Sequence, residues 1–119
     1  MLKVVVAARA RTEIKEALVR SSERFGPRIA RAYGALIAQS LIDLAERPVL
    51  LRSEDQLFPG CKLYHLRWSL RRARRVRGIR LGGARHFLVC EERDGAIHVL
   101  CLAHDSRDMP SIYPGKKGG

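Results

Sequence analysis

The residues with the clearest chemical capacity in this sequence are six arginines that fall within ten positions. They are Arg71, Arg72, Arg74, Arg75, Arg77 and Arg80. The planar guanidinium group of arginine suits phosphates and carboxylates, to which it can donate two hydrogen bonds at once. Residues 61–90 hold nine Lys/Arg side chains and no Asp or Glu, whereas a surface that serves only solubility would mix the two signs. We therefore interpret this stretch as a binding surface for an acidic partner, and a plain solvated face is the alternative.

Aromatic side chains flank the arginine run but do not enter it. Tyr64 and Trp68 precede the run, and the next aromatic ring of this type is Phe87. A module that reads single-stranded nucleic acid would stack bases on such rings. The residues alone are therefore compatible with two kinds of partner, a nucleic acid and an acidic protein segment.

The histidines and cysteines do not have the spacing of a metal site. We predict no metal and no cofactor. The cysteines are Cys61, Cys90 and Cys101, an odd number that is typical of reduced, packed thiols in a cytoplasmic protein. His104 could act as a general base, or it could be a strand-end histidine held by Asp105 or Asp108. We interpret the remaining polar candidates as packing or surface residues without chemistry: His65, His86, His98, Glu13, Glu16, Asp43 and Glu46.

Length and composition predict one domain with a single modest core. The chain has 119 residues, 46% of them hydrophobic, and a net charge of +11. Apolar runs such as Val4–Ala8 and Ala35–Ala38 are far shorter than the roughly 20 residues that a membrane span needs. We therefore expect a cytoplasmic protein that does not engage a membrane.

The first half of the sequence predicts a strand and two helices. Residues 1–8 are rich in valine, as in a buried strand. Thr12 is a candidate N-cap for a helix over residues 12–25, and Gly26-Pro27 ends that helix and begins another over 27–47. Each helix has one apolar stripe, so the pair should form an αα-hairpin that lies on a sheet.

The second half predicts strands around a tight turn. Residues 61–68 are expected to form a strand, and residues 70–77 a strand edge or an exposed loop. Asp94-Gly95 is a turn dipeptide between strands 85–93 and 96–104. A type I′ turn there pairs Glu91 with His98, Cys90 with Val99, and Leu88 with Cys101. Both faces of this hairpin are apolar, so the second face should be covered by the arginine-rich segment or left for a partner.

These elements predict an α+β fold, with an N-terminal strand and an αα-hairpin packed on one face of a mainly antiparallel sheet. We expect one domain over residues 1–113 and a flexible tail over 114–119.

This order of elements, together with local motifs in the second half, resembles the RelE/ParE toxin superfamily. The motifs are Tyr64-His65-Leu66-Arg67 before the basic run, Arg85-His86-Phe87-Leu88-Val89, and the stretch from Val99 to Pro110. In ParE-like toxins the last strand typically ends in a His with an Asp four residues later, a spacing that His104 and Asp108 keep. The resemblance runs to about Tyr113. It implies the toxin of a bacterial type II toxin–antitoxin system, neutralised by a cognate antitoxin protein.

Two activities occur on this fold. RelE-like members cut messenger RNA on the ribosome with a Lys/Arg cluster and a C-terminal tyrosine, whereas ParE-like members inhibit DNA gyrase by binding. Alignment places the arginines of the nuclease branch near Phe87 and Asp105, and its tyrosine near Ser111, two residues before Tyr113. An aspartate in place of a phosphate-stabilising arginine would repel the charge of the transition state. The resemblance thus favours a ParE-like, non-catalytic gyrase inhibitor. A ribosome-dependent mRNA endoribonuclease is the alternative, and an inactive or nucleic-acid-binding relative is the second alternative.

The resemblance and the charge pattern together nominate two sets of site residues. The partner-binding set is Arg67, Arg71, Arg72, Arg74, Arg75, Arg77, Arg80, Arg85, Arg107, Asp108 and Tyr113. A nuclease would instead use Arg67, Arg85, His104, Arg107 and Tyr113.

Overall fold

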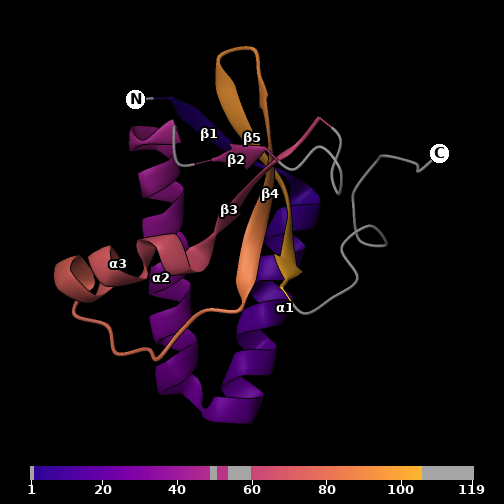
Figure 1. Ribbon diagram of the computed structural model, residues 1–119. Helices are drawn as coiled ribbons and strands as arrows, with labels where there is room; N and C mark the ends of the chain where they lie inside the picture. Colours follow the sequence, from indigo (N-terminus) through magenta and orange to yellow (C-terminus); the bar gives the residue numbers. More distant parts are fainter. Residues whose placement is uncertain (1, 49–50, 54–59, 106–119) are drawn as a thin grey trace.

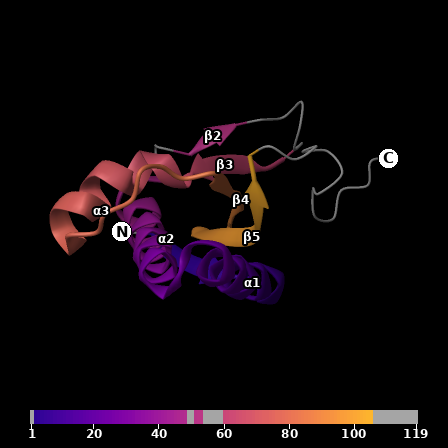
Figure 2. The same ribbon diagram turned by 90° about the horizontal axis from the view of Figure 1, so that it is seen from below.

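The computed structural model describes residues 2–48, 51–53 and 60–105. Along the chain these form β1 (Lys3–Val6), α1 (Ala8–Phe25), α2 (Pro27–Glu46), β2 (Arg52–Ser53), β3 (Lys62–His65), the 3₁₀ turn η2 (Leu66–Ser69), α3 (Leu70–Arg77), β4 (His86–Arg93) and β5 (Ala96–His104). The fold is the predicted α+β class, with the helical hairpin α1–α2 on one face of the sheet (Figures 1 and 2).

The strands form one sheet in the order β1-β5-β4-β3-β2. β1 runs parallel to β5, and the remaining neighbours pair antiparallel, so the sheet is mainly antiparallel as predicted. A parallel pair needs a crossover connection, and here the αα-hairpin begins that connection directly after β1. The hairpin is thereby laid across the sheet, and its apolar stripes join the buried side of β4 and β5 in one core.

The first helix begins a turn earlier than the sequence predicts. Thr12 is not the N-cap: α1 starts at Ala8, and Ala7 caps it without a side-chain hydrogen bond. The amide of Ala7 still donates to Val99 of β5, at 2.9 Å, so the chain passes straight from strand to helix. The fully buried Ala10 explains the extra turn, because packing against the core stabilises helix where no capping side chain does.

The break between the two helices is where the sequence places it. Gly26 has a positive φ of 94°, and its amide donates to the carbonyl of Ser22. Pro27 then occupies the first turn of α2. Glycine adopts this backbone without strain, and proline needs no partner for a missing N–H there, so the chain reverses within one residue.

The arginine-rich stretch is a helix, not the predicted strand edge or loop. α3 buries Leu70 and Ala73, one turn apart, and ends at Gly78 in the left-handed conformation (φ 67°). The predicted strand over residues 61–68 is accordingly shorter, ending at His65. In the sequence, Leu70 and Ala73 are two apolar residues among basic ones. Two such positions are too few to show the hydrophobic periodicity of a helix.

The turn at Asp94-Gly95 is confirmed, with both residues at positive φ (55° and 73°), as a type I′ turn requires. The predicted register holds as far as Cys90 opposite Val99. The register then shifts between Val89 and Cys90, so that Cys101 lies opposite Val89 and not Leu88. A bulge adds one residue to β5 and moves Cys101 to the other face of the sheet.

The second face of the sheet is not an open apolar surface. Five of its side chains are buried, with exposed fractions of 0 to 4%: Cys61, Phe87, Val89, Cys101 and Ala103. Leu63 and Leu100, which pack against them, are partly buried. The arginine-rich segment does not supply the cover, since α3 packs against α2 and η2. The expectation that this face awaits the arginine-rich segment or a partner is therefore wrong for these residues.

The three cysteines are buried thiols, as predicted. Burial raises the pKa of the Cys101 thiol to about 12 and raises that of Cys90 as well, so both stay protonated at neutral pH. None of the helices in the described ranges has the length and hydropathy to cross a membrane. The proposed domain boundary at residue 113 lies outside the described residues.

Candidate functional site

Three strands bring their histidines to one end of the sheet. His65 closes β3, His86 opens β4, and His104 closes β5 directly opposite His86. Arg85 and Asp105 continue β4 and β5 by one residue each, and the amide of Asp105 donates to the carbonyl of Arg85 at 2.7 Å. With Tyr33 of α2 these five residues form what we call the strand-end cluster.

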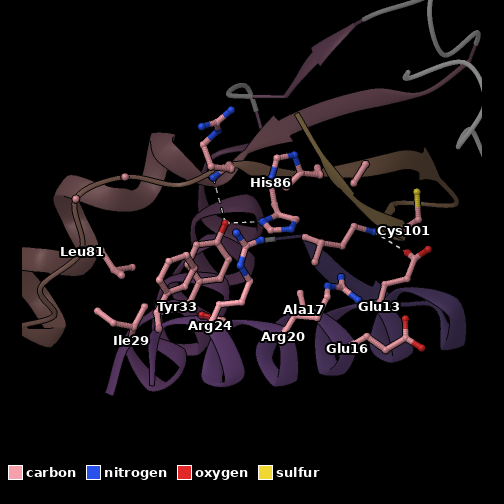
Figure 3. A pocket seen from close by; sticks show the side chains of 18 of the residues that line it. Glu13, Glu16, Ala17, Arg20, Arg24, Ile29, Tyr33, Leu81, His86 and Cys101 are labelled. Atoms are coloured by element: carbon pink, nitrogen blue, oxygen red, sulfur yellow. Dashed lines mark hydrogen bonds between the residues drawn. The ribbon is translucent and has the colours of Figure 1, made fainter. Parts of the chain in front are cut away.

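Tyr33 joins the helical hairpin to this cluster. Its hydroxyl accepts a hydrogen bond from the amide of Arg85 (3.2 Å) and forms a second hydrogen bond with Nδ1 of His86 (2.7 Å) (Figure 3). Burial raises the pKa of Tyr33 to about 12. Burial, with a smaller contribution from His104, lowers the pKa of His86 to about 4. Both groups are thus neutral at pH 7, and the contact is structural.

His65 also has both ring nitrogens engaged. Its Nδ1 accepts from the amide of Arg67 at 3.1 Å, so its Nε2 carries the proton and donates to Asp105 at 2.9 Å. A histidine used in this way orients the carboxylate and has no free nitrogen with which to take a proton from a substrate.

Asp105 accepts side-chain hydrogen bonds from two other members of the cluster, His65 and Arg85. Its second oxygen accepts from Nε of Arg85 at 3.2 Å. Partial burial acts to raise the pKa of Asp105, but the hydrogen bonds from His65 and Arg85 outweigh it and hold this pKa below its usual value. The carboxylate is therefore charged and neutralises the exposed guanidinium of Arg85.

His104 is not held by a hydrogen bond to Asp105, contrary to one of the two expectations for it. The nearest approach of Nδ1 to the carboxylate is 3.9 Å, and the hydrogen bond of Asp105 goes to His65 instead. The ring of His104 contacts His86 edge-on, with centroids 5.0 Å apart. Asp108, the other expected partner, lies outside the described residues.

A groove of about 940 Å³ opens beside the cluster, between α1, the loop before β4 and the end of β5. We call it the α1 groove. Its lining is apolar around Ala17, Ile29 and Leu81. Arg20 and Arg24, one turn apart, project into it from α1 (Figure 3). The groove thus combines an apolar lining with charged residues among which four arginines (Arg9, Arg20, Arg24 and Arg85) outnumber two glutamates (Glu13 and Glu16).

Glu13 belongs to the wall of this groove and is not the ordinary surface acid that the sequence predicts. Its carboxylate accepts from the amide of Leu102 (2.9 Å) and from Nε of Arg9 (2.9 Å). β1 pairs with β5 only as far as Val99, so the amide of Leu102 has no strand on that side. Glu13 satisfies this donor and ties α1 to β5.

Asp43 also differs from the prediction of a surface acid, since only 3% of it is exposed. It accepts from Ser69 Oγ at 2.6 Å and from Nε2 of Gln39 at 3.0 Å. Arg72 of α3 lies 3.4 Å from the carboxylate and 3.6 Å from that of Glu46. The Asp43 contact is an ion pair without hydrogen-bond geometry, because Nε of Arg72 has no hydrogen-bond partner among the described residues.

The other arginines of α3 and its flanks have no acidic partner in the described part of the chain. Arg77 donates to the amide oxygen of Gln39 at 2.9 Å, and Arg74 donates to the backbone carbonyl of Leu81. Both acceptors are uncharged. Within residues 2–48, 51–53 and 60–105, six of the predicted site arginines have no carboxylate partner: Arg67, Arg71, Arg74, Arg75, Arg77 and Arg80.

The predicted site residues therefore separate into two groups. The arginines of α3 and its flanks form one surface, whereas Arg85 and His104 belong to the strand-end cluster. Arg107, Asp108 and Tyr113 lie outside the described residues. In the part of the chain that is described, no three His, Cys, Asp or Glu side chains are placed to share a metal ion.

Sequence reasoning missed Tyr33, Glu13 and the pair Arg20 and Arg24. The spacing of the two arginines, four residues apart on a predicted helix, was a visible signal. The roles of Tyr33 and Glu13 depend on partners 53 and 89 residues away, for which the sequence carries no local sign.

Comparison with known proteins gives a match of structure and none of sequence. No protein-family model matches this chain, and no curated protein matches it. Among solved structures it is similar to a chain described as "Chromosomal ParDE TA system from P. aeruginosa". The TM-score is 0.64, with 12% identity, over 87% of this chain and 96% of the other. At this identity the likeness establishes the fold, which is RelE/ParE-like.

Proposed function

We propose that this chain is the toxin of a type II toxin–antitoxin pair and that it acts in the ParE-like manner, by binding DNA gyrase. The observation that carries the proposal is the similarity of fold to a chain of a ParDE TA system, which extends over nearly the whole of both chains. The resemblance of the C-terminal motifs supports the same family.

The strand-end cluster favours inhibition by binding over catalysis. A ribonuclease on this scaffold needs a cation that stabilises the negative charge of the transition state. Here the carboxylate of Asp105 already neutralises Arg85, and both nitrogens of His65 are engaged. A negative carboxylate at this position would oppose a developing phosphorane.

A RelE-like ribosome-dependent endoribonuclease is the second candidate, because two side chains of the cluster face solvent. The side chain of Arg85 is 68% exposed and that of His104 is 37% exposed. Such an enzyme would use them together with Arg67, Arg107 and Tyr113. If the chain is such an enzyme, a single arginine substitution should remove most of the activity.

The partner that neutralises the toxin is a cognate antitoxin, and the α1 groove is its binding site in this proposal. An antitoxin segment with apolar residues on one face and acids on its borders would complement the apolar lining and the Arg20 and Arg24 rim. The chain from Arg107 through Asp108 to Tyr113 is assigned to the target, as the resemblance implies.

The test is to express the chain alone in a bacterium and follow growth, plasmid topology and protein synthesis together. We expect growth arrest in which DNA supercoiling fails before translation. Co-expression of an acidic antitoxin encoded beside the toxin should restore growth.

Two results would count against the proposal. Translation that fails first, with messenger RNA cut on the ribosome, would establish the nuclease candidate. Normal growth with full expression would indicate an inactive relative.

A further inference from the structure

The surface of α3 carries positive charge that the described parts of the protein do not balance. Six arginines on α3 and its flanks have no carboxylate partner there, as described above. Acids are also absent from the local sequence, since residues 61–90 contain none. Clustered like charges repel one another, so such a surface is favourable mainly when an anion covers it.

α3 presents these arginines from a fixed position. Leu70 and Ala73 are buried beneath it, and Arg72 pairs with Asp43 on α2. Arg77 adds a hydrogen bond to Gln39. Contacts with Gln39 and Asp43, on two successive turns of α2, thus hold the helix in place, and a ligand would not have to order it.

Arg71 and Arg75 occupy the outward side of α3, whereas Arg77 faces α2. Leu70 and Ala73 define the inward side, so helical periodicity turns Arg71 and Arg75, one turn apart, away from the core. Figures 1 and 2 both place α3 at the margin of the molecule, beside α2. The outward side is therefore accessible to a large partner.

This surface lacks the features of a protein interface. The core of such an interface is apolar, and aromatic residues commonly anchor it. Among the residues of α3, the exposed large apolar side chain is that of Val76. Trp68 is partly buried against Tyr64, with ring centroids 5.2 Å apart, and is not placed to stack on a base. Charge without an apolar anchor is the pattern of contacts to a nucleic acid backbone.

We propose that α3 binds the phosphate backbone of double-stranded DNA, without sequence preference. An α-helix with its side chains is about 10–12 Å wide and fits the major groove of B-form DNA, which is about 12 Å wide. The major groove of an RNA duplex is too narrow to admit it. This activity goes beyond the proposed function and depends on neither the antitoxin nor gyrase.

The test measures the affinity of the full chain for a mixed-sequence DNA duplex as a function of salt. If all six arginines contact phosphates, affinity should fall on the order of a thousandfold between about 50 mM and 200 mM salt. A second duplex of unrelated sequence should bind equally. Single-stranded DNA, duplex RNA and polyglutamate of equal charge should each bind more weakly.

Variants locate the site. The double variant Arg71→Ala/Arg75→Ala should reduce the salt dependence to on the order of a hundredfold, because two phosphate contacts are lost. The control Arg28→Ala/Arg31→Ala removes the same charge from exposed positions near the start of α2 and should bind as the wild type does. Circular dichroism should show that both variants keep the native fold.

Four results would overturn the proposal: no DNA binding at low salt, equal loss of affinity in both double variants, equal binding of duplex RNA, or equal binding of polyglutamate. The last would assign the surface to an acidic protein. The proposed function is tested separately by growth arrest. Failure of these DNA-binding tests would therefore leave the proposed toxin function untouched.

Discussion

The hydroxyl of Tyr33 on α2 lies 2.7 Å from Nδ1 of His86 at the start of β4. This hydrogen bond joins the helical hairpin to the sheet at the end where the strand-end cluster and the α1 groove meet. The same hydroxyl accepts from the amide of Arg85. One side chain thus satisfies two polar groups that are otherwise removed from water.

Replacing Tyr33 with phenylalanine should destabilise the protein by about 1–2 kcal/mol, because the amide of Arg85 and Nδ1 of His86 lose their partner. Urea unfolding of the wild type and Tyr33→Phe measures the difference. The conservative swap keeps the ring and its packing, so an unchanged midpoint would mean that the hydrogen bond contributes nothing to stability.

Acid should weaken the fold through His86. Burial lowers the pKa of His86 in the folded protein to about 4, below its usual value of about 6.5. Between these values the unfolded chain takes up a proton that the folded protein does not, so stability falls as pH drops from about 6.5 towards 4. Thermal unfolding at several pH values should show this loss.

The variant His86→Gln tests the assignment, because glutamine can still accept from Tyr33 but does not titrate. Its stability should vary less with pH across this window than that of the wild type. His98→Gln, on the sheet surface opposite Glu91, is the control and should behave as the wild type. Equal pH dependence in all three proteins would show that another group is responsible.

Two neighbouring arginines on α3 should differ in their effect on stability. Arg72→Ala removes the counter-charge of the buried Asp43 and should cost about 1–2 kcal/mol. Arg71→Ala removes an exposed side chain without a described partner and should change stability by less than about 0.5 kcal/mol. Chemical denaturation of both variants checks this, and similar losses would contradict the assigned roles.

Reversing the charge of the α1 groove should weaken the binding of the proposed antitoxin. Arg20→Glu/Arg24→Glu would repel an acidic segment and should weaken antitoxin binding about 10- to 100-fold, while growth arrest persists. Arg28→Glu/Arg31→Glu reverses as many charges outside the groove and should leave antitoxin binding nearly unchanged. Calorimetric titration of the purified pair gives both affinities. Equal affinity for the wild type and the groove variant would place the antitoxin elsewhere.

Local sequence signals predicted much of this fold. Gly26-Pro27 and Asp94-Gly95 place both turns, because each dipeptide requires a particular backbone conformation. Those signals do not report long-range packing. The bulge that moves Cys101 to the other face depends on the pairing of two whole strands, and the early start of α1 depends on the burial of Ala10.

The candidate site was less predictable than the fold. The arginines were evident from the composition. The sequence did not show that most of them form a surface on α3 and its flanks, whereas Arg85 pairs with a carboxylate. This difference follows from Asp105, which the alignment marked as unfavourable for a nuclease but did not connect to His65, 40 residues earlier. Asp43 looked like a surface acid because its partners, Ser69 and Arg72, lie on a helical segment that the sequence did not indicate.

The role of Arg85 separates binding from catalysis in the proposed toxin. An inhibitor that relies on many contacts should lose affinity modestly, in a salt-dependent way, when Arg85 is replaced with alanine. A nuclease should lose on the order of a hundred- to a thousandfold in rate. Ribosome-dependent cleavage of messenger RNA by the wild type and Arg85→Ala distinguishes the two.

Supercoiling by purified DNA gyrase, measured as the purified chain is added, tests the proposed inhibition most directly. We expect supercoiling to decline in proportion to the added protein and to stop once the gyrase is saturated. Supercoiling that continues unchanged in the presence of a large excess of correctly folded protein would contradict the proposed inhibition.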